Sequence, residues 1–333
     1  MNTRKVLSLF LVVFFVLGLM MVVGCEPEEA VEPDPEEPDG PQRWTIASGW
    51  VAGVYYPVSG AMSRVAYEEM DNLSLTAESS GASVANARLI GTRDAELAIL
   101  QNDIAYYSQQ GIEMFEGEAV PEMRGFFTLY PEHCQIVASA DAGIENPGDL
   151  AGKDVAVGPL GSGTEANAVQ ILEAYDLTFD DLGSVERLTA SEAADFLRDD
   201  RIDAAFFTVG LGAAAIEEVA IIKDVVIVDI EDDKIDWLIE TYPYYSEEVI
   251  PAETYSGVPE AQTVAVLAMV VGHADLPEDL AYEFTSGIFE NIDTIHGAHE
   301  RGTLITLDTA LDGMPIELHP GAERYFQEQG LVD

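Results

Sequence analysis

Short apolar runs that end in Gly/Ser/Thr loops, each followed by a helical pattern, recur along most of the chain. The first three units place strands at residues 44–48, 73–78 and 95–100, loops at 49–56, 79–83 and 101–103, and helices that begin at Pro57, Val84 and Ile104. Apolar residues in the helices recur three and four positions apart, which is typical of a face packed on a sheet. This succession predicts a parallel sheet whose loops gather at the carboxyl ends of the strands, where ligands bind in such folds.

A second series follows a turn-rich bridge at residues 141–152. Residues 126–129 and 135–138 before it are predicted strands separated by a turn at 130–133. The series itself has strands at 154–157, 185–188, 204–207 and 225–230, a helix at 191–198 with Ser191 as N-cap and no full capping box, and a loop at 208–212. An apolar run at 263–271 and an amphipathic helix at 277–295 come last. The two series predict two α/β lobes that face each other across a ligand cleft, the build of a solute-binding clamp.

Residues 154–167 contain the most distinctive of these loops, with glycines at positions 158, 161 and 163. Glycines let the backbone approach a ligand closely, and the unpaired N–H groups that begin a helix suit a carboxylate or a phosphate. No Lys follows the last glycine, which excludes a phosphate-binding P-loop, and Leu160 and Thr164 stand where a nucleophile elbow requires glycine. The pattern is equally that of an ordinary strand–helix turn with a good N-cap.

Residues 1–25 are predicted to be a targeting segment. Arg4 and Lys5 precede an apolar run of about 15 residues, which is short for a membrane span. The run ends in Gly24-Cys25, which resembles a bacterial lipobox. We therefore expect a lipid on Cys25 that anchors the folded part outside the cytoplasmic membrane, with an uncleaved signal anchor as the alternative. Residues 26–42 are predicted to be an acidic, Pro-rich disordered tether, because residues 26–40 hold eight acidic residues and four prolines.

The chain is strongly acidic, with 15 Lys and Arg against 61 Asp and Glu and a formal net charge of −46. This charge excludes nucleic acid and anionic membrane surfaces as partners. Few lysines beside so many acids indicate a protein that works in concentrated salt, where self-repulsion is screened, so a halophilic source is expected. Cys134 is the one cysteine besides Cys25, so no internal disulfide or zinc cluster is expected, and it is predicted to be buried.

Ten motifs in a fixed order carry a resemblance to a known family: Gly53-Val-Tyr-Tyr-Pro57, Glu78-Ser-Ser-Gly-Ala-Ser83, Leu100-Gln-Asn-Asp103, Leu129-Tyr-Pro-Glu-His133, residues 158–167, residues 191–195, residues 201–208, Pro243-Tyr-Tyr-Ser246, Ile250-Pro251 and residues 319–325. They span residues 44 to about 330. The chain resembles TAXI-type (TRAP-associated extracytoplasmic immunogenic) solute-binding proteins, the receptors of tripartite ATP-independent periplasmic (TRAP) transporters.

The resemblance implies a type II-like periplasmic-binding-protein fold in which the chain crosses the hinge twice, near Ala138 and near Thr263. Lobe one is then residues 43–138 plus 263–333, and lobe two is residues 139–262. As partner it implies a cation-driven TRAP membrane subunit in which the small and large parts are fused. It also implies a ligand similar to glutamate, glutamine or 2-oxoglutarate. No cofactor is expected.

The loops at the strand ends supply the expected ligand-binding residues: Tyr55, Tyr56, Ser79, Ser80, Gln101, Asn102, Asp103, Ser162, Gly163, Thr164, Glu165, Asn167, Thr208 and Tyr245. We expect a ligand carboxylate to be held by neutral donors, the N–H and O–H groups at 162–164 and the Tyr56 phenol. Glu165 or Asp103 would meet an ammonium group. Trp50 is expected to narrow or line the pocket.

Two further charged features are not expected to bind a ligand or a metal. Arg88 lies inside a predicted helix and is expected to pack rather than to contact ligand. The acidic run at residues 231–233 is more consistent with a solvated loop than with a metal site, so no metal is expected.

Two other classes of function are an enzyme and the receptor of a different kind of importer. An enzyme is not expected, because the five His residues are scattered and none is spaced to pair with a nucleophile. The alternative receptor is the substrate-binding lipoprotein of an ATP-driven (ABC) importer. A gene for a many-span membrane subunit beside this one favours the TRAP partner, and a gene for an ATPase favours the importer.

Overall fold

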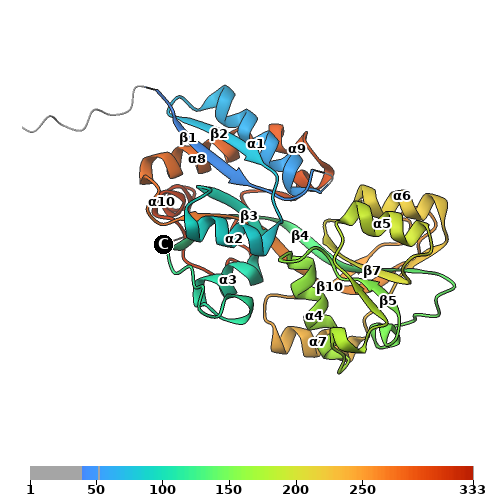
Figure 1. The fold of residues 1–333 in the computed structure, drawn as a ribbon. Coiled ribbons are helices and arrows are strands. Elements are labelled where there is room, and N and C mark those ends of the chain that lie inside the picture. The colour runs from blue at the N-terminus through green and yellow to red at the C-terminus, as the bar shows by residue number, and fades with distance from the viewer. Residues whose placement is uncertain (1–39, 52, 333) are drawn as a thin grey trace, which may run out of the picture. The chain divides into compact units, whose positions relative to one another are not determined.

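The computed structural model describes residues 40–51 and 53–332, drawn in colour in Figure 1. Ten strands form one mixed sheet in the order β2-β1-β3-β10-β4-β7-β5-β6, with β8 paired to β4 and β9 paired to β10. The predicted signal segment, Cys25 and the tether up to residue 39 lie outside the described residues. Within those residues, no helix has the length and apolar character needed to cross a membrane.

The first sheet half consists of parallel strands and the helices that follow them, as the alternation of apolar runs and loops predicts. Its strands are β1 (Gln42–Ala47), β2 (Leu73–Glu78) and β3 (Leu97–Gln101), followed by α1 (Tyr55–Glu69), α2 (Ser83–Thr92) and α3 (Asn102–Gln110). All of β3 is buried, as expected of a central strand. Helices α8 (Glu278–Glu290), α9 (Ile292–His296) and α10 (Pro320–Glu328) return to this half and pack near α1.

The second sheet half repeats this plan with shorter strands. It contains β5 (Asp154–Ala156), β6 (Ser184–Glu186), β7 (Ala204–Val209), β8 (Val225–Ile227) and β9 (Ser246–Ile250), with α4 (Gly163–Ala174), α5 (Ala190–Arg198), α6 (Ala214–Ile222) and α7 (Asp232–Thr241). Strands β5, β6 and β7 are parallel. Single 3-10 turns lie at Glu113–Phe115, Pro147–Leu150, Phe179–Asp181 and Glu300–Leu304.

Two long antiparallel strands, β4 (Met123–Ser139) and β10 (Ala261–His273), pass from one sheet half to the other. Strand β10 pairs with β3 through residues 268–272 and with β9 through residues 261–265. Strand β4 pairs with β10 as far as His133 and with β7 from His133 onward. The partners therefore change near residues 132–133 and 265–268. The lobe boundaries placed at Ala138 and Thr263 from the sequence stay a prediction.

Several local predictions were wrong. The turn at residues 130–133 is part of the continuous β4, in which Pro131 lies opposite Leu267 beside a register shift that accommodates its missing N–H. Helix α5 is capped by Thr189 and not by Ser191. The Thr189 side chain accepts from the Glu192 N–H, and the Glu192 carboxylate accepts from the Thr189 N–H, a full capping box.

Two further errors concern helix ends. The helix predicted at residues 277–295 is interrupted at Asn291, which separates α8 from α9. Helix α1 begins at Tyr55 rather than at Pro57. The buried position of Cys134 is confirmed, with 2% of its surface exposed.

Asn86 of α2 fixes the strand ends that carry the site. Its side-chain Nδ2 donates to the carbonyls of Ser48 (2.5 Å) and Ile99 (2.7 Å) and more weakly to that of Ala47 (3.3 Å). Asn86 is fully buried. It therefore ties the carboxyl end of β1 to β3 at the point where the loop at residues 48–54 begins.

We expect Asn86→Ala to lower the free energy of unfolding by about 2 kcal/mol or more, because buried carbonyls would lose their donors. Urea unfolding measures this change. Asn72→Ala is the matched control, since Asn72 is exposed and donates to Glu283, and it should change stability by no more than about 0.5 kcal/mol. Equal effects of the two variants would show that Asn86 does not fix these strand ends.

Candidate functional site

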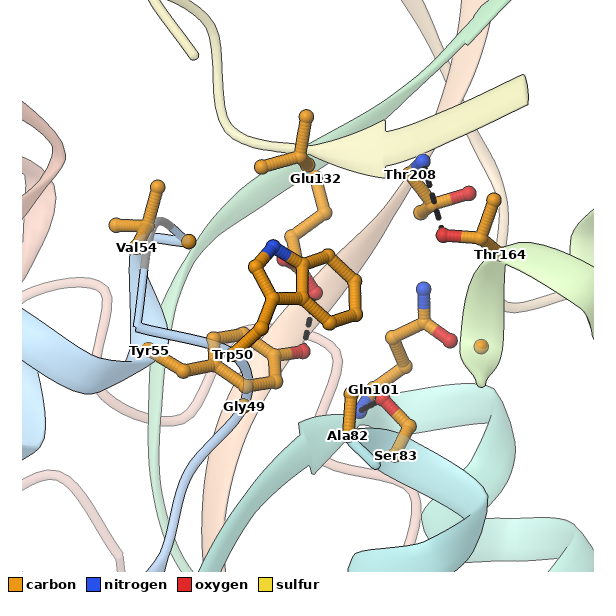
Figure 2. Close-up of a pocket in the computed structure, with 13 residues that line it drawn as sticks. Gly49, Trp50, Val54, Tyr55, Ala82, Ser83, Gln101, Glu132, Thr164 and Thr208 are labelled. Atoms are coloured by element: carbon orange, nitrogen blue, oxygen red, sulfur yellow. Dashed lines mark hydrogen bonds between the residues drawn. The ribbon is translucent and has the colours of Figure 1, made fainter. Parts of the chain in front are cut away.

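A cavity lies where loops from both sheet halves meet at the carboxyl ends of β1, β3 and β7 (Figure 2). It holds about 360 Å³ of space free of protein atoms, part of it open to solvent. The lining residues come from segments far apart in the sequence: Gly49, Trp50, Gly53, Val54, Tyr55, Ala82, Ser83, Gln101, Glu132, Gly163, Thr164, Thr208 and Val209.

Glu132 is the one ionisable acid among the described residues that line this cavity. It lies on β4 at the change of strand partner, is 3% exposed, and accepts a hydrogen bond from the Tyr55 hydroxyl, marked in Figure 2. Burial raises the pKa of Glu132 to about 8, against the opposing effect of the Tyr55 hydrogen bond. No Lys, Arg or His is among the same lining residues. The carboxylate therefore has no cationic partner in the cavity.

The first turn of α4 forms the opposite wall. Ser162 is the N-cap and its hydroxyl accepts from the Glu165 N–H, while Gly163 and Thr164 line the cavity. The first N–H groups of a helix have no partner within it, and the helix dipole favours negative charge there. The Thr164 hydroxyl accepts from the backbone N–H of Thr208 at 3.3 Å, which fixes α4 against the end of β7. This wall has the chemistry of an anion site.

Gln101, at the end of β3, lies directly against this turn. Its Nε2 donates to Asn167 Oδ1 at 3.0 Å, but its Oε1 is buried and has no hydrogen-bond partner among the described residues. A Cβ added to Gly163 would lie 1.6 Å from Gln101 Oε1, so only glycine allows this approach. The amide therefore carries a buried acceptor without a partner beside the first turn of α4.

A buried polar network behind Gln101 connects the two sheet halves. Asn167 Nδ2 donates to Asp103 Oδ2 (3.1 Å) and to the Tyr245 hydroxyl (2.8 Å). The Tyr245 hydroxyl in turn donates to Gln170 Oε1 at 2.5 Å. Burial raises the pKa of Asp103 to about 6. Because Asp103 lies on α3 of the first half and Asn167 on α4 of the second, the bond between them holds the two halves together behind Gln101.

Five of the residues predicted from the sequence line the cavity: Tyr55, Gln101, Gly163, Thr164 and Thr208. Asp103, Asn167 and Tyr245 belong to the network behind it, and Ser162 caps α4. Asn102 is held by the backbone, since its Oδ1 accepts from Leu267 and its Nδ2 donates to Gly313. These five stand near the cavity without lining it.

The remaining predicted residues lie outside the cavity lining. Ser79 is exposed, the Ser80 hydroxyl donates to the Ser48 carbonyl, and Tyr56 is half-buried beside Tyr55. Glu165 accepts from Arg187 at 2.6 Å and from the Gly161 N–H, so its charge is already paired. Arg88 pairs with Glu118, away from the cavity lining.

Sequence reasoning missed Glu132 and Ser83 as lining residues, although it suggested Trp50. Glu132 was assigned to a turn, where a glutamate is unremarkable. Its position inside the apolar stretch 126–138 was the signal available, because an acid in a buried strand requires a special partner. Ser83 accepts from the Gln101 N–H at 3.3 Å and so helps to hold this amide's strand end.

The acidic run at residues 231–233 is not a loop. Glu231 is the N-cap residue of α7 and accepts from the Tyr175 hydroxyl, and the two aspartates begin the helix, where negative charge is favourable. Among residues 40–51 and 53–332 no three His, Cys, Asp or Glu side chains are grouped as metal ligands.

Two sheet halves joined by two long strands, with a cavity built from both, define a two-lobed solute-binding protein. Residues 46–330 match the model of the NMT1-like family, so the chain belongs to this family. Its members are extracytoplasmic solute-binding receptors rather than enzymes, in agreement with the sequence prediction that the protein is not an enzyme.

Solved structures similar to this chain include three from bacteria. A protein of Bordetella bronchiseptica RB50 is 15% identical over 87% of this chain and 89% of its own, with a TM-score of 0.51, and has the same fold. PhnD1 of Prochlorococcus marinus, in complex with methylphosphonate, is 10% identical over 88% and 100%, with a TM-score of 0.49. The periplasmic aliphatic sulphonate binding protein SsuA of Escherichia coli is 12% identical over 86% and 83%, with a TM-score of 0.47.

We expect Gly163→Ala to preserve the fold but to reduce ligand affinity at least tenfold, because the new methyl group displaces the Gln101 amide from α4. Calorimetry with the ligand found by the screen described below measures the loss. Gly60→Ala is the control: Gly60 lies in α1, and an added Cβ there meets no atom within 4 Å. A Gly163→Ala variant with unchanged affinity would exclude the contact with Gln101 from ligand binding.

Proposed function

We propose that this protein is a receptor that captures a small α-amino acid between its lobes and delivers it to a membrane transporter. The observation that carries the proposal is the buried Glu132 carboxylate, which shares the cavity with the first turn of α4 and has no cationic partner there. One wall offers an acid that ionises beside a positive group, and the other offers N–H donors. A zwitterion satisfies both walls at once.

The ligand's carboxylate would be held by the N–H groups of Gly163 and Thr164, while the Thr208 hydroxyl donates to Cys134 Sγ. The ligand's ammonium group would donate to Glu132 and to the free Oε1 of Gln101. Tyr55, whose hydroxyl already donates to Glu132, orients that carboxylate. This arrangement assigns the ammonium to Glu132 in place of Glu165 or Asp103, whose oxygens already accept from Arg187 and from Asn167.

Among the three ligands expected from the sequence, glutamate and glutamine carry an ammonium group and 2-oxoglutarate does not. A second acid beside Glu132 would be repelled once Glu132 ionises, whereas an ammonium group favours its ionised form. The electrostatics of the cavity therefore favour an amino acid over an oxo acid.

The proposed recipient is the membrane subunit of a TRAP transporter, with small and large parts fused, because motifs of TAXI-type receptors run in order from residue 44 to about 330. Uptake should then collapse when an ionophore removes the sodium or proton gradient and should continue when ATP is depleted under a clamped gradient. Dependence on ATP would assign the receptor to an ABC importer.

We also propose that Cys25 carries a lipid that anchors the receptor at the outer face of the cytoplasmic membrane. The lipobox-like Val22-Val23-Gly24-Cys25 supports this proposal. The excess of 61 acidic over 15 basic residues supports a working environment of concentrated salt.

The test of the receptor is a thermal-shift screen of the amino acids and of 2-oxoglutarate in high salt, followed by calorimetry. A ligand that binds the native state raises the melting temperature by mass action. We expect amino acids to raise it and 2-oxoglutarate to leave it unchanged. A response to 2-oxoglutarate alone, or to no amino acid, would contradict the proposal.

Glu132 should also make stability depend on pH. Burial raises its pKa from the ordinary value of 4.5 to about 8, so the folded state binds the proton more tightly than the unfolded state. The resulting stabilisation is complete below about pH 4.5 and is lost as the pH rises through about 8. Without ligand, the melting temperature of the wild type should therefore fall more than that of Glu132→Gln between these pH values. Parallel curves for the two proteins would contradict the buried, proton-binding carboxyl.

Glu132→Gln should also lower amino-acid affinity about tenfold to a hundredfold, because a charged hydrogen bond contributes about 1.5–3 kcal/mol. Glu165→Gln is the matched control and should bind as the wild type does, since Glu165 pairs with Arg187. Loss of affinity in Glu165→Gln and not in Glu132→Gln would reverse the assignment of the ammonium site.

Thr164→Ala should weaken binding as well, by about tenfold or more, since the hydroxyl that fixes the first turn of α4 to Thr208 is lost. Calorimetry measures the change. Wild-type affinity in this variant would remove Thr164 from the site.

A further inference from the structure

A second cavity adjoins the first and extends beneath α5 and α6. It holds about 420 Å³ of space free of protein atoms, part of it open to solvent. Trp50, Gly53, Thr164, Thr208 and Val209 line both cavities, so the two adjoin and share a wall. We call the second cavity the annex.

The walls of the annex differ in chemistry from those of the first cavity. Beyond the shared residues, the described lining consists of apolar side chains and glycine, with Phe206 and Phe207 of β7 and Leu188 among them. Four alanines complete the wall: Ala190, Ala193, Ala213 and Ala215. None of these lining residues can carry a charge. Their small size is what keeps the space open, because larger side chains at the same positions would fill it.

The geometry of α4 connects the two spaces. Gly163 and Thr164 begin the helix beside the first cavity, and Thr164 also lines the annex. Thr208 likewise faces both. A ligand whose carboxylate occupies the first turn of α4 therefore has its α-carbon at the junction, with the ammonium toward Glu132 and one remaining direction, into the annex.

We propose that the ligand is an amino acid with an aliphatic side chain, such as valine or leucine, and that the annex holds this side chain. The inference rests on the proposed amino-acid function and narrows it. An aliphatic group gains from leaving water for this apolar wall. A glutamate carboxylate there would lose its hydration without a partner, and a buried charge without a partner is strongly disfavoured.

Trp50 lies at the junction of the two cavities. Figure 2 shows its indole across the cavity from Gln101 and Thr164, and its ring belongs to the lining of both spaces. The indole can lie here because residue 53 is glycine: a Cβ added to Gly53 would lie 3.0 Å from the Trp50 Nε1 atom. The indole therefore provides apolar surface to the α-carbon and the first methylene group of the side chain.

The decisive experiment titrates the wild-type protein by calorimetry with glycine, alanine, valine, leucine and glutamate. We expect affinity to rise about fourfold for each added methylene group from glycine to leucine, and glutamate to bind at least tenfold more weakly than leucine. Tighter binding of glutamate, or equal binding along the series, would overturn the aliphatic assignment while leaving the amino-acid receptor in place. Binding of none of the five would overturn the proposed receptor function itself.

A variant that fills the annex tests its position. Ala193→Leu should lower leucine affinity more than tenfold and leave glycine affinity within about twofold, because only the side-chain space is removed. Ala215→Val is a milder filling of the same wall, for use if Ala193→Leu fails to fold. Ala214→Leu is the matched control, since Ala214 is exposed on α6 outside the annex, and should bind as the wild type does. Equal loss of glycine and leucine in a folded annex variant would overturn the assignment.

Discussion

A carboxylate buried on the strand that joins the two sheet halves is the constraint on which the rest of the site depends. Glu132 lies on β4 where its partner changes from β10 to β7, and its hydrogen bond comes from Tyr55 at the start of α1. An ionised carboxylate in such a place is unfavourable unless a positive group meets it. The protein leaves that group to be supplied from outside. Binding and ionisation are therefore coupled at one residue.

The same coupling extends to the arrangement of the halves. Gln101 of the first half lies against Gly163 of the second, and Asn167 joins Asp103 to Tyr245. These bonds form only when the halves are close, so they stabilise the arrangement that encloses the cavity. A ligand that contacts Glu132 on one wall and α4 on the other binds this arrangement better than an open one, and so shifts the population toward it.

The sequence predicted the fold class and five of the residues that line the cavity, because both depend on local patterns. A strand, a glycine loop and a helix start can each be recognised within a few residues, which is why Gln101, Gly163 and Thr164 were predicted from the sequence. Glu132 was not, because its role depends on burial and on Tyr55, which lies 77 positions away. The capping of α5 by Thr189 was missed because the helix extends beyond its periodic apolar residues. The alanines of the annex carry no local signal, since alanine is common in any helix.

The charge of the whole protein and the chemistry of the cavity lead to the same kind of ligand. With a net charge of −46, the molecule repels anions and attracts cations wherever salt does not screen the field. A dianion would be repelled by this field. A simple cation has no negative group to accept hydrogen bonds from the first turn of α4. A zwitterion with an uncharged side chain has no net charge to be repelled, yet presents one group of each sign at short range. Selection in this site would therefore come from the spacing of Glu132 and α4 and from the apolar wall beyond them, and would be little affected by the salt that an acidic surface requires.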